Sequence, residues 1–210
     1  MTRPFRLGGI IAGLILIAFG AGAIVIGLNG RHEVNTNIKR EQIVGTPDMK
    51  PSLIAEKVKE AGLTNVTLPT CDVAGKAITN GSDAKCFASY MRIHALEATG
   101  GQTYAEMAQF ATADGKGTDV AAQAAKDPKT GAPMSNQARQ VWINETALST
   151  ALNTSFFAAS VGLFAIVMGI ALLLSGIGFL VLALGLLGRS GLRQKSGADA
   201  PIGGAKPAGV

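Results

Sequence analysis

Two long apolar runs dominate the hydropathy pattern of the chain. The first covers residues 7–28, and the second covers residues 156–187 without a charge or a proline. A helix as long as the second run measures about 48 Å, whereas the hydrocarbon core of a bilayer is about 30 Å thick. A second crossing within that run would leave about ten residues after a turn, roughly half of what a crossing needs. Each run therefore predicts one transmembrane helix.

The polar stretch between the two runs predicts a mostly helical domain. Gly62 is a suitable residue to end one helix, and Thr103 and Glu106 form a capping box that opens another. No proline or glycine interrupts the chain from Ser135 to Val161, so a helix is expected to begin at the N-cap residue Ser135 and continue into the second apolar run. The expected helices before it cover residues 52–61, 83–99, 103–112 and 119–126.

These patterns predict an all-α membrane protein, with two antiparallel transmembrane helices and an α-rich extracytoplasmic domain between them. A cleaved signal peptide is the alternative for the first run, because Ala21 and Ala23 flank Gly22 as at a cleavage site, but the apolar run continues beyond them. The expected segments are a cytoplasmic N-terminus (1–6), a transmembrane helix (7–28), the extracytoplasmic domain (29–134), a stalk helix (135–160), a second transmembrane helix (161–187) and a disordered cytoplasmic tail (188–210).

The distribution of charge predicts the orientation in the plasma membrane. Residues 31–155 contain thirteen Lys or Arg and thirteen Asp or Glu, so the net charge of +5 comes from the two ends of the chain. Short flanks rich in Lys and Arg stay cytoplasmic, and both termini are therefore expected inside. No basic face with interleaved aromatic residues is present, so we expect the bilayer and not nucleic acid as a partner.

Glycines recur every seven residues in both apolar runs, which predicts a helix-packing seam. Small residues let helix backbones approach closely in lipid, where the hydrophobic effect does not drive association. In an antiparallel pair the two glycine stripes come level with each other, although a homo-oligomer would use the same stripe. The seam residues are Gly13, Gly20 and Gly27 in the first run and Gly162, Gly169 and Gly176 in the second.

Cys71 and Cys86 are the only cysteines and both fall in the segment expected outside. An even number of cysteines in an oxidising compartment favours one disulfide over two buried thiols. A redox-active pair is disfavoured, because the spacing is far from Cys-x-x-Cys.

His94 and Glu97 are three residues apart on an expected helix and could supply two metal ligands from one face. The only other histidine is His32, close to the first apolar run, so the expected reading is structural. No phosphate-binding loop, nucleophile elbow or intramembrane ionisable residue is present in the sequence. We therefore expect no cofactor, no metal and no catalytic residue.

Two stretches carry a resemblance to a known group of proteins. The run from His94 to Met107 and the run from Glu145 to Asn153, followed by the second apolar run, resemble small actinobacterial membrane proteins with two spans and an outer domain. The resemblance implies this architecture and no established activity. Some relatives carry the label of an aromatic-ring-opening dioxygenase, but non-haem iron needs two histidines and a carboxylate, and His32 and His94 are far apart in the sequence.

The function predicted from the sequence is non-enzymatic: an extracytoplasmic interaction or scaffold domain, as in an accessory subunit of a cell-envelope complex. The expected partner is a membrane or envelope protein, or a second copy of the chain. A homo-oligomeric two-span channel is one alternative, although neither apolar run has a polar stripe that could line water. An extracytoplasmic metal-dependent enzyme centred on His94 and Glu97 is the other.

Overall fold

The computed structural model describes residues 2–186, and this part of the chain is helical and contains no β-strand. The all-helical fold class is thus confirmed for these residues. The tail expected to be disordered, residues 188–210, lies outside the described residues. The elements are α1 (Thr2–Arg40), α2 (Pro51–Glu60), α3 (Gly81–Ala98), the 3₁₀ turn η1 (Ala121–Gln123), α4 (Gln137–Val181) and the π-helical turn η2 (Leu182–Leu186).

Two helices are long and apolar enough to cross a membrane. Their segments Pro4–Arg40 and Gln137–Gly185 each contain an 18-residue window with a mean hydropathy of 2.6, of which only 11% is buried within the protein. Both helices run well beyond the apolar residues themselves, since α1 ends at Arg40 and α4 begins at Gln137. The expected continuation of the second apolar helix toward the N-terminus is confirmed, because α4 is unbroken over 45 residues.

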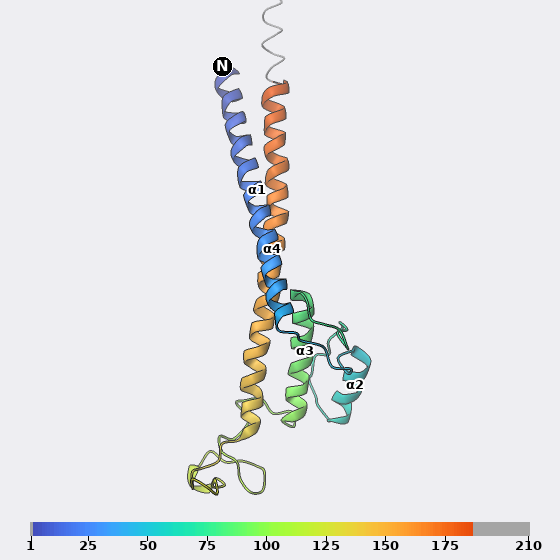
Figure 1. Ribbon diagram of the computed structural model, residues 1–210, viewed down its shortest axis with the longest axis vertical. Coiled ribbons are helices and arrows are strands. Elements are labelled where there is room, and N and C mark those ends of the chain that lie inside the picture. Colours follow the sequence, from blue (N-terminus) through green and yellow to red (C-terminus); the bar gives the residue numbers. More distant parts are fainter. Residues whose placement is uncertain (1, 187–210) are drawn as a thin grey trace, which may run out of the picture. The chain divides into compact units, whose positions relative to one another are not determined.

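The chain divides into two compact units. Among the described residues, the first unit consists of 2–28 and 163–186, and the second consists of 29–162. In the described part of the first unit, α1 and α4 lie side by side (Figure 1). Most of their large apolar side chains are exposed, among them Phe19 at 69% and Phe164 at 66%. The surface of this pair of helices is therefore apolar.

The second unit has a conventional core of buried side chains. Its four largest fully buried side chains are Ile54 of α2, Tyr90 and Ile93 of α3, and Ile78 of the preceding loop. Because each such side chain contributes about 1.5–3 kcal/mol when it is removed from water, this cluster is the main source of cohesion between α2 and α3. Figure 1 shows these two helices beside each other within this unit.

A smaller cluster packs the end of α3 onto α4. Trp142 is 4% exposed and contacts the buried side chains of Ala95 and Met107. Its indole N–H donates to the carbonyl oxygen of Gln102 at 2.7 Å, with the Thr99 hydroxyl 3.3 Å away. The indole group thus gives both apolar contact and a satisfied polar atom, as a buried tryptophan requires.

The ends of α3 follow from short-range hydrogen bonds. The side-chain oxygen of Asn80 accepts from the backbone N–H groups of Ser82 and Asp83 at 2.9 and 3.0 Å, so Asn80 is the N-cap. At the other end Gly100 and Gly101 have φ values of 62° and 82°, which glycine adopts without strain. The expected helix over 83–99 is therefore present as Gly81–Ala98.

The predicted helix over 103–112 is wrong. Only half of the capping box forms: the Glu106 carboxylate accepts from the N–H and the hydroxyl of Thr103 at 2.6 and 2.8 Å, but the Glu106 N–H bonds to the Thr103 carbonyl oxygen instead of the hydroxyl. Beyond it, however, the backbone bonds to distant partners: Phe110 exchanges hydrogen bonds with Thr118, and Ala111 donates to a carbonyl at residue 134. These long-range bonds replace the i→i−4 bonds that a helix needs.

Two smaller corrections concern the neighbouring segments. The expected helix over 119–126 is reduced to η1, because its C-terminal part is extended and Ala125 donates to the Ala111 carbonyl instead of a helical partner. The helix predicted to begin at Ser135 begins at Gln137. Its cap is Asn136, whose side-chain oxygen accepts from the N–H of Ala138 at 3.0 Å.

Candidate functional site

Two of the glycine pairs of the predicted helix-packing seam are in close contact within the first unit. A Cβ atom on Gly13 would be 2.8 Å from the carbonyl oxygen of Gly176, and a Cβ atom on Gly20 would be 2.7 Å from that of Gly169. These backbones are therefore too close for any larger residue. The two remaining seam residues, Gly27 and Gly162, are also buried.

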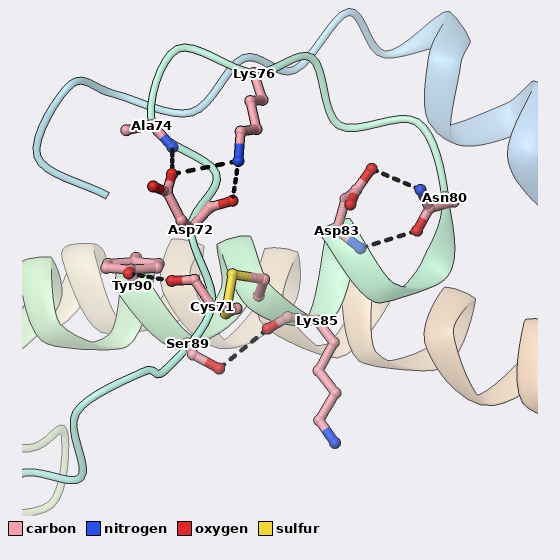
Figure 2. Close-up of a disulfide and its surroundings, with 10 residues drawn as sticks. Cys71, Asp72, Ala74, Lys76, Asn80, Asp83, Lys85, Ser89 and Tyr90 are labelled. Carbon is pink, nitrogen blue, oxygen red and sulfur yellow. Dashed lines mark hydrogen bonds and ion pairs between the residues drawn. A yellow bond between two sulfur atoms is a disulfide. The ribbon is translucent and has the colours of Figure 1, made fainter. Parts of the chain in front are cut away.

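The two cysteines form a disulfide in the second unit. The Sγ atoms of Cys71 and Cys86 are 2.02 Å apart, and the bond joins the loop before residue 72 to α3. The Tyr90 hydroxyl, one turn further along α3, donates to the Cys71 carbonyl oxygen at 2.6 Å (Figure 2). Burial, followed by the negative charge of Asp72, raises the pKa of Tyr90, so this hydroxyl keeps its proton and remains a donor. Loop and helix are thus held by one covalent bond and one hydrogen bond.

His94 lies between two carboxylates in the same unit. Its Nε2 is 3.4 Å from Asp48 Oδ2 and its Nδ1 is 3.5 Å from Glu97 Oε2. Lys57 Nζ is 3.1 Å from the same Asp48 oxygen. Lys57 belongs to α2, whereas His94 and Glu97 belong to α3. The cluster therefore links α2 and α3 through Asp48, which is a structural task.

The electrostatics of Asp48 fit this task. Burial acts to raise the pKa of its carboxyl group, but the hydrogen bond from Thr46, the ammonium group of Lys57 and the charge of His94 together outweigh burial. The pKa of Asp48 is therefore lowered below its ordinary value of 3.8. The carboxylate is ionised throughout the neutral range and can hold the Lys57 ammonium group together with the His94 ring.

No group of three or more His, Cys, Asp or Glu side chains within residues 2–186 is arranged to hold a metal ion. The exposed His32 belongs to α1, and the His94 cluster contains no second histidine. The two histidines and one carboxylate that the dioxygenase label would require are thus not gathered in the described part of the chain.

A cavity beside the disulfide contains residues that sequence reasoning missed. It measures about 610 Å³ and lies among residues 67–71, the exposed side of α3, and Phe156 of α4. Lys85 and Arg92 are its only charged lining residues. A sequence signal for them was available, because polar residues at 82, 85, 89 and 92 repeat with the spacing of one helix face. The cavity is larger than four other concave sites of the second unit, which measure about 270 to 560 Å³.

Comparison of the chain with family models, with curated proteins and with solved structures finds no match.

Proposed function

We propose that the protein is an integral membrane protein with two antiparallel spans, both termini in the cytoplasm and residues 29–160 outside it. The single observation that supports this most strongly is the reversed pattern of side chains in the first unit. The two helices turn glycines toward each other and large apolar residues outward. Such a surface is costly in water and favourable in hydrocarbon, where close backbone approach holds helices together.

The antiparallel arrangement is supported by the order of the contacts. From Gly9 to Gly20 along α1, the partner positions run backward from Ala183 of η2 to Gly169 of α4. The outward placement of the domain is supported by the basic chain ends and by the disulfide, because disulfides persist in oxidising compartments. The resemblance to small actinobacterial membrane proteins favours the same architecture.

Within this architecture we assign the second unit a binding or scaffold role, as in an accessory subunit of a cell-envelope complex. The His94 cluster supports this role, because Asp48 connects Lys57 of α2 to His94 of α3 and these ionisable groups are thus used in holding the two helices together. The exposed apolar surface of both long helices offers further contact area for a membrane partner or a second copy of the chain.

Thiol labelling combined with reporter fusions tests the topology. A reporter that works only in the cytoplasm should be active when fused after Val210. A reporter that works only outside the cytoplasm should be active when inserted near Gly115. In intact cells, a membrane-impermeant maleimide should label Cys71 and Cys86 only after a reductant is added, because the disulfide leaves no free thiol. Labelling without reductant, or reporters active on the opposite faces, would contradict the proposal.

Photo-crosslinking of the full chain in its native membrane tests the scaffold role. A photoreactive residue at Val120, which is 50% exposed in the second unit, should join the chain to a distinct membrane or envelope protein. The same residue at Ile54, which is fully buried, is the matched control and should give no adduct. Adducts with a second copy of this chain alone would favour the homo-oligomer, and no adduct at any exposed position of the domain would count against scaffolding.

A further inference from the structure

The cavity of about 610 Å³ in the second unit has a wall on each side that is fixed in place. One wall is the loop of residues 67–71, and the other is the exposed side of α3. The disulfide between Cys71 and Cys86 joins the two walls and itself lines the cavity. Its volume falls within the range of about 300–1,000 Å³ that is usual for sites of small ligands.

The charge of the cavity is positive. Lys85 and Arg92 line it, and no Asp or Glu does. Among the residues that the structure describes, no carboxylate forms an ion pair with either cation. Figure 2 shows the Lys85 side chain extending away from Asp83 and Asp72. An anion in the cavity would therefore meet two cations, neither of which is held in an ion pair within the part of the chain that the structure describes.

Aromatic rings position both cations. Lys85 Nζ lies 4.4 Å from the centre of the Phe156 ring, and the guanidinium carbon of Arg92 lies 5.2 Å from that of Trp142. Contacts of this kind contribute about 0.5–1 kcal/mol at exposed sites. They orient the side chains without neutralising them, so the positive charge stays available to a ligand.

Hydroxyl groups complete the polar part of the lining. Four of the lining residues carry a hydroxyl that can donate to an oxygen atom, and they come from both walls. One of them, on Ser89, already donates its single O–H to the Lys85 carbonyl oxygen at 3.0 Å, beside the lysine side chain (Figure 2), so the other three hydroxyls remain as donors to a ligand. A tetrahedral oxyanion has enough acceptor positions to use several such donors together with the cations. The four residues are Thr67, Thr70, Ser82 and Ser89.

The remaining lining is apolar and lies near the beginning of a candidate span. Leu68, Pro69 and Phe156 supply it. Phe156 is five residues before Val161 on the continuous helix α4, or about 7.5 Å along the helix axis. The cavity thus offers cations and hydroxyls for a charged group together with an apolar edge.

We propose that this cavity binds a phosphate-bearing anion through Lys85 and Arg92. The apolar edge and the position of Phe156 at the start of the second apolar run favour the headgroup of an anionic phospholipid as the source of the phosphate. This choice of source rests on the proposed membrane topology, whereas the binding of phosphate chemistry does not. A zwitterionic headgroup fits less well, because the lining has no carboxylate to pair with its cationic part.

Titration of the purified full chain in a non-ionic detergent tests the proposal. The probes are dioctanoyl phosphatidylglycerol, dioctanoyl phosphatidylcholine and inorganic phosphate, and binding is followed by native mass spectrometry. We expect the anionic lipid to bind at least about tenfold more tightly than the zwitterionic one, because hydrogen bonds to charged groups are worth about that factor or more. Binding by the anionic lipid alone assigns the site to a lipid, and equal competition by inorganic phosphate assigns it to a free anion.

Variants of Lys85 identify the site. Lys85→Gln should weaken binding of the anionic lipid about tenfold, and Lys85→Arg should retain it, since only the first removes the charge. Lys116→Gln is the matched control, because Lys116 is exposed and outside the cavity. Lys85 is preferred to Arg92 as the target because Arg92 also contacts the buried Trp142. An unchanged thermal midpoint would show that each variant is folded.

Three results would overturn the proposal. These are equal binding of the anionic and zwitterionic lipids, an unchanged affinity in Lys85→Gln, and an equal loss in the Lys116→Gln control. Because the titration uses detergent-solubilised protein, it gives the same result whichever side of a membrane the domain occupies. Failure here would therefore leave the topology untouched, and reporters on the wrong faces would leave the phosphate site untouched.

Discussion

In the first unit α1 and α4 approach each other closely at glycine residues, which have no side chain. The second unit is instead held together by large side chains that fill its core. The contacts of the first unit bring backbone against backbone, with Gly20 close to Gly169. The second unit buries Ile54 and Tyr90 completely and adds a disulfide. In water, burial of large apolar groups drives packing, and in hydrocarbon it does not, so close backbone approach takes its place.

The comparison implies that the two units can be damaged separately. A residue that adds bulk should harm the glycine seam and spare the domain, while loss of the disulfide should do the reverse. The predictions below test this separation, beginning with the largest expected effect.

Gly169→Leu should break the association of α1 with α4. A Cβ atom at this position would be 2.7 Å from the carbonyl oxygen of Gly20 and 3.0 Å from the backbone nitrogen of Ile24, and neither atom can rotate away. Overpacking of this kind costs about 1–3 kcal/mol or more, which corresponds to roughly a tenfold change or larger. The measurement is oxidative crosslinking of Gly9→Cys to Ala183→Cys, where an added Cβ at position 9 would be 3.1 Å from the alanine Cβ.

The matched control is Gly178→Leu on the same helix. Nothing lies within 4 Å of a Cβ atom there, so the crosslink between positions 9 and 183 should form as in the parent. The thermal transition of the second unit should stay in place in both variants. Undiminished crosslinking in Gly169→Leu would refute the close approach of the two helices at that residue.

Replacing both Cys71 and Cys86 by serine should destabilise the second unit. The bond closes a loop with a sequence separation of 15, and in the chain-entropy model a loop of this size is worth about 3 kcal/mol. Thermal denaturation of the full chain in detergent, followed by circular dichroism, measures the loss. Reductant should lower the midpoint of the parent chain and leave that of the double variant unchanged. A crosslink between positions 9 and 183 that disappears along with the disulfide would argue against separate units.

Asp48→Asn should destabilise the second unit by about 1 kcal/mol at neutral pH, since it removes the charge that holds Lys57 and His94. The pKa of Asp48 is lowered in the folded protein, so the unfolded chain binds its proton more readily. The stabilisation is therefore complete above the ordinary value of 3.8 and is lost as the pH falls through the lower folded value. Thermal midpoints measured from pH 7 to pH 2 should show the difference between variant and parent vanishing toward the acid end.

Glu56→Gln on the exposed side of α2 is the control for this comparison, and its difference from the parent should be small at every pH. A difference between Asp48→Asn and the parent that stays constant from pH 7 to pH 2 would show that the carboxylate charge plays no part.

Capping residues and glycines in the sequence predicted helix boundaries correctly where hydrogen bonds between near neighbours in the sequence determine the boundary. Gly62 follows the end of α2 as expected, since its φ of 64° is one that glycine adopts freely. The hydrogen bond from Thr103 to Glu106 formed without a helix behind it, because Phe110 exchanges hydrogen bonds with Thr118. Long-range pairing of this kind has no signature within the four residues of a capping box, so the local pattern alone could not predict it.

In the candidate sites too, contacts within one helix could be predicted from the sequence, whereas contacts between distant segments could not. The spacing of His94 and Glu97 predicted that they share a helix face, but Asp48, which completes the cluster, comes from a loop 46 residues earlier. The polar face containing Lys85 could have been read from α3 alone. Its meeting with Phe156 depends on the packing of two helices far apart in the sequence.

Trp142 gives this molecule a built-in optical reporter. It is the only tryptophan in the chain, and its ring is enclosed where the end of α3 meets α4. Emission from this single fluorophore should shift to longer wavelength when that junction opens to solvent, and no second indole would obscure the change. One spectrum could therefore follow the folding of the second unit inside an intact lipid vesicle, with no dye attached.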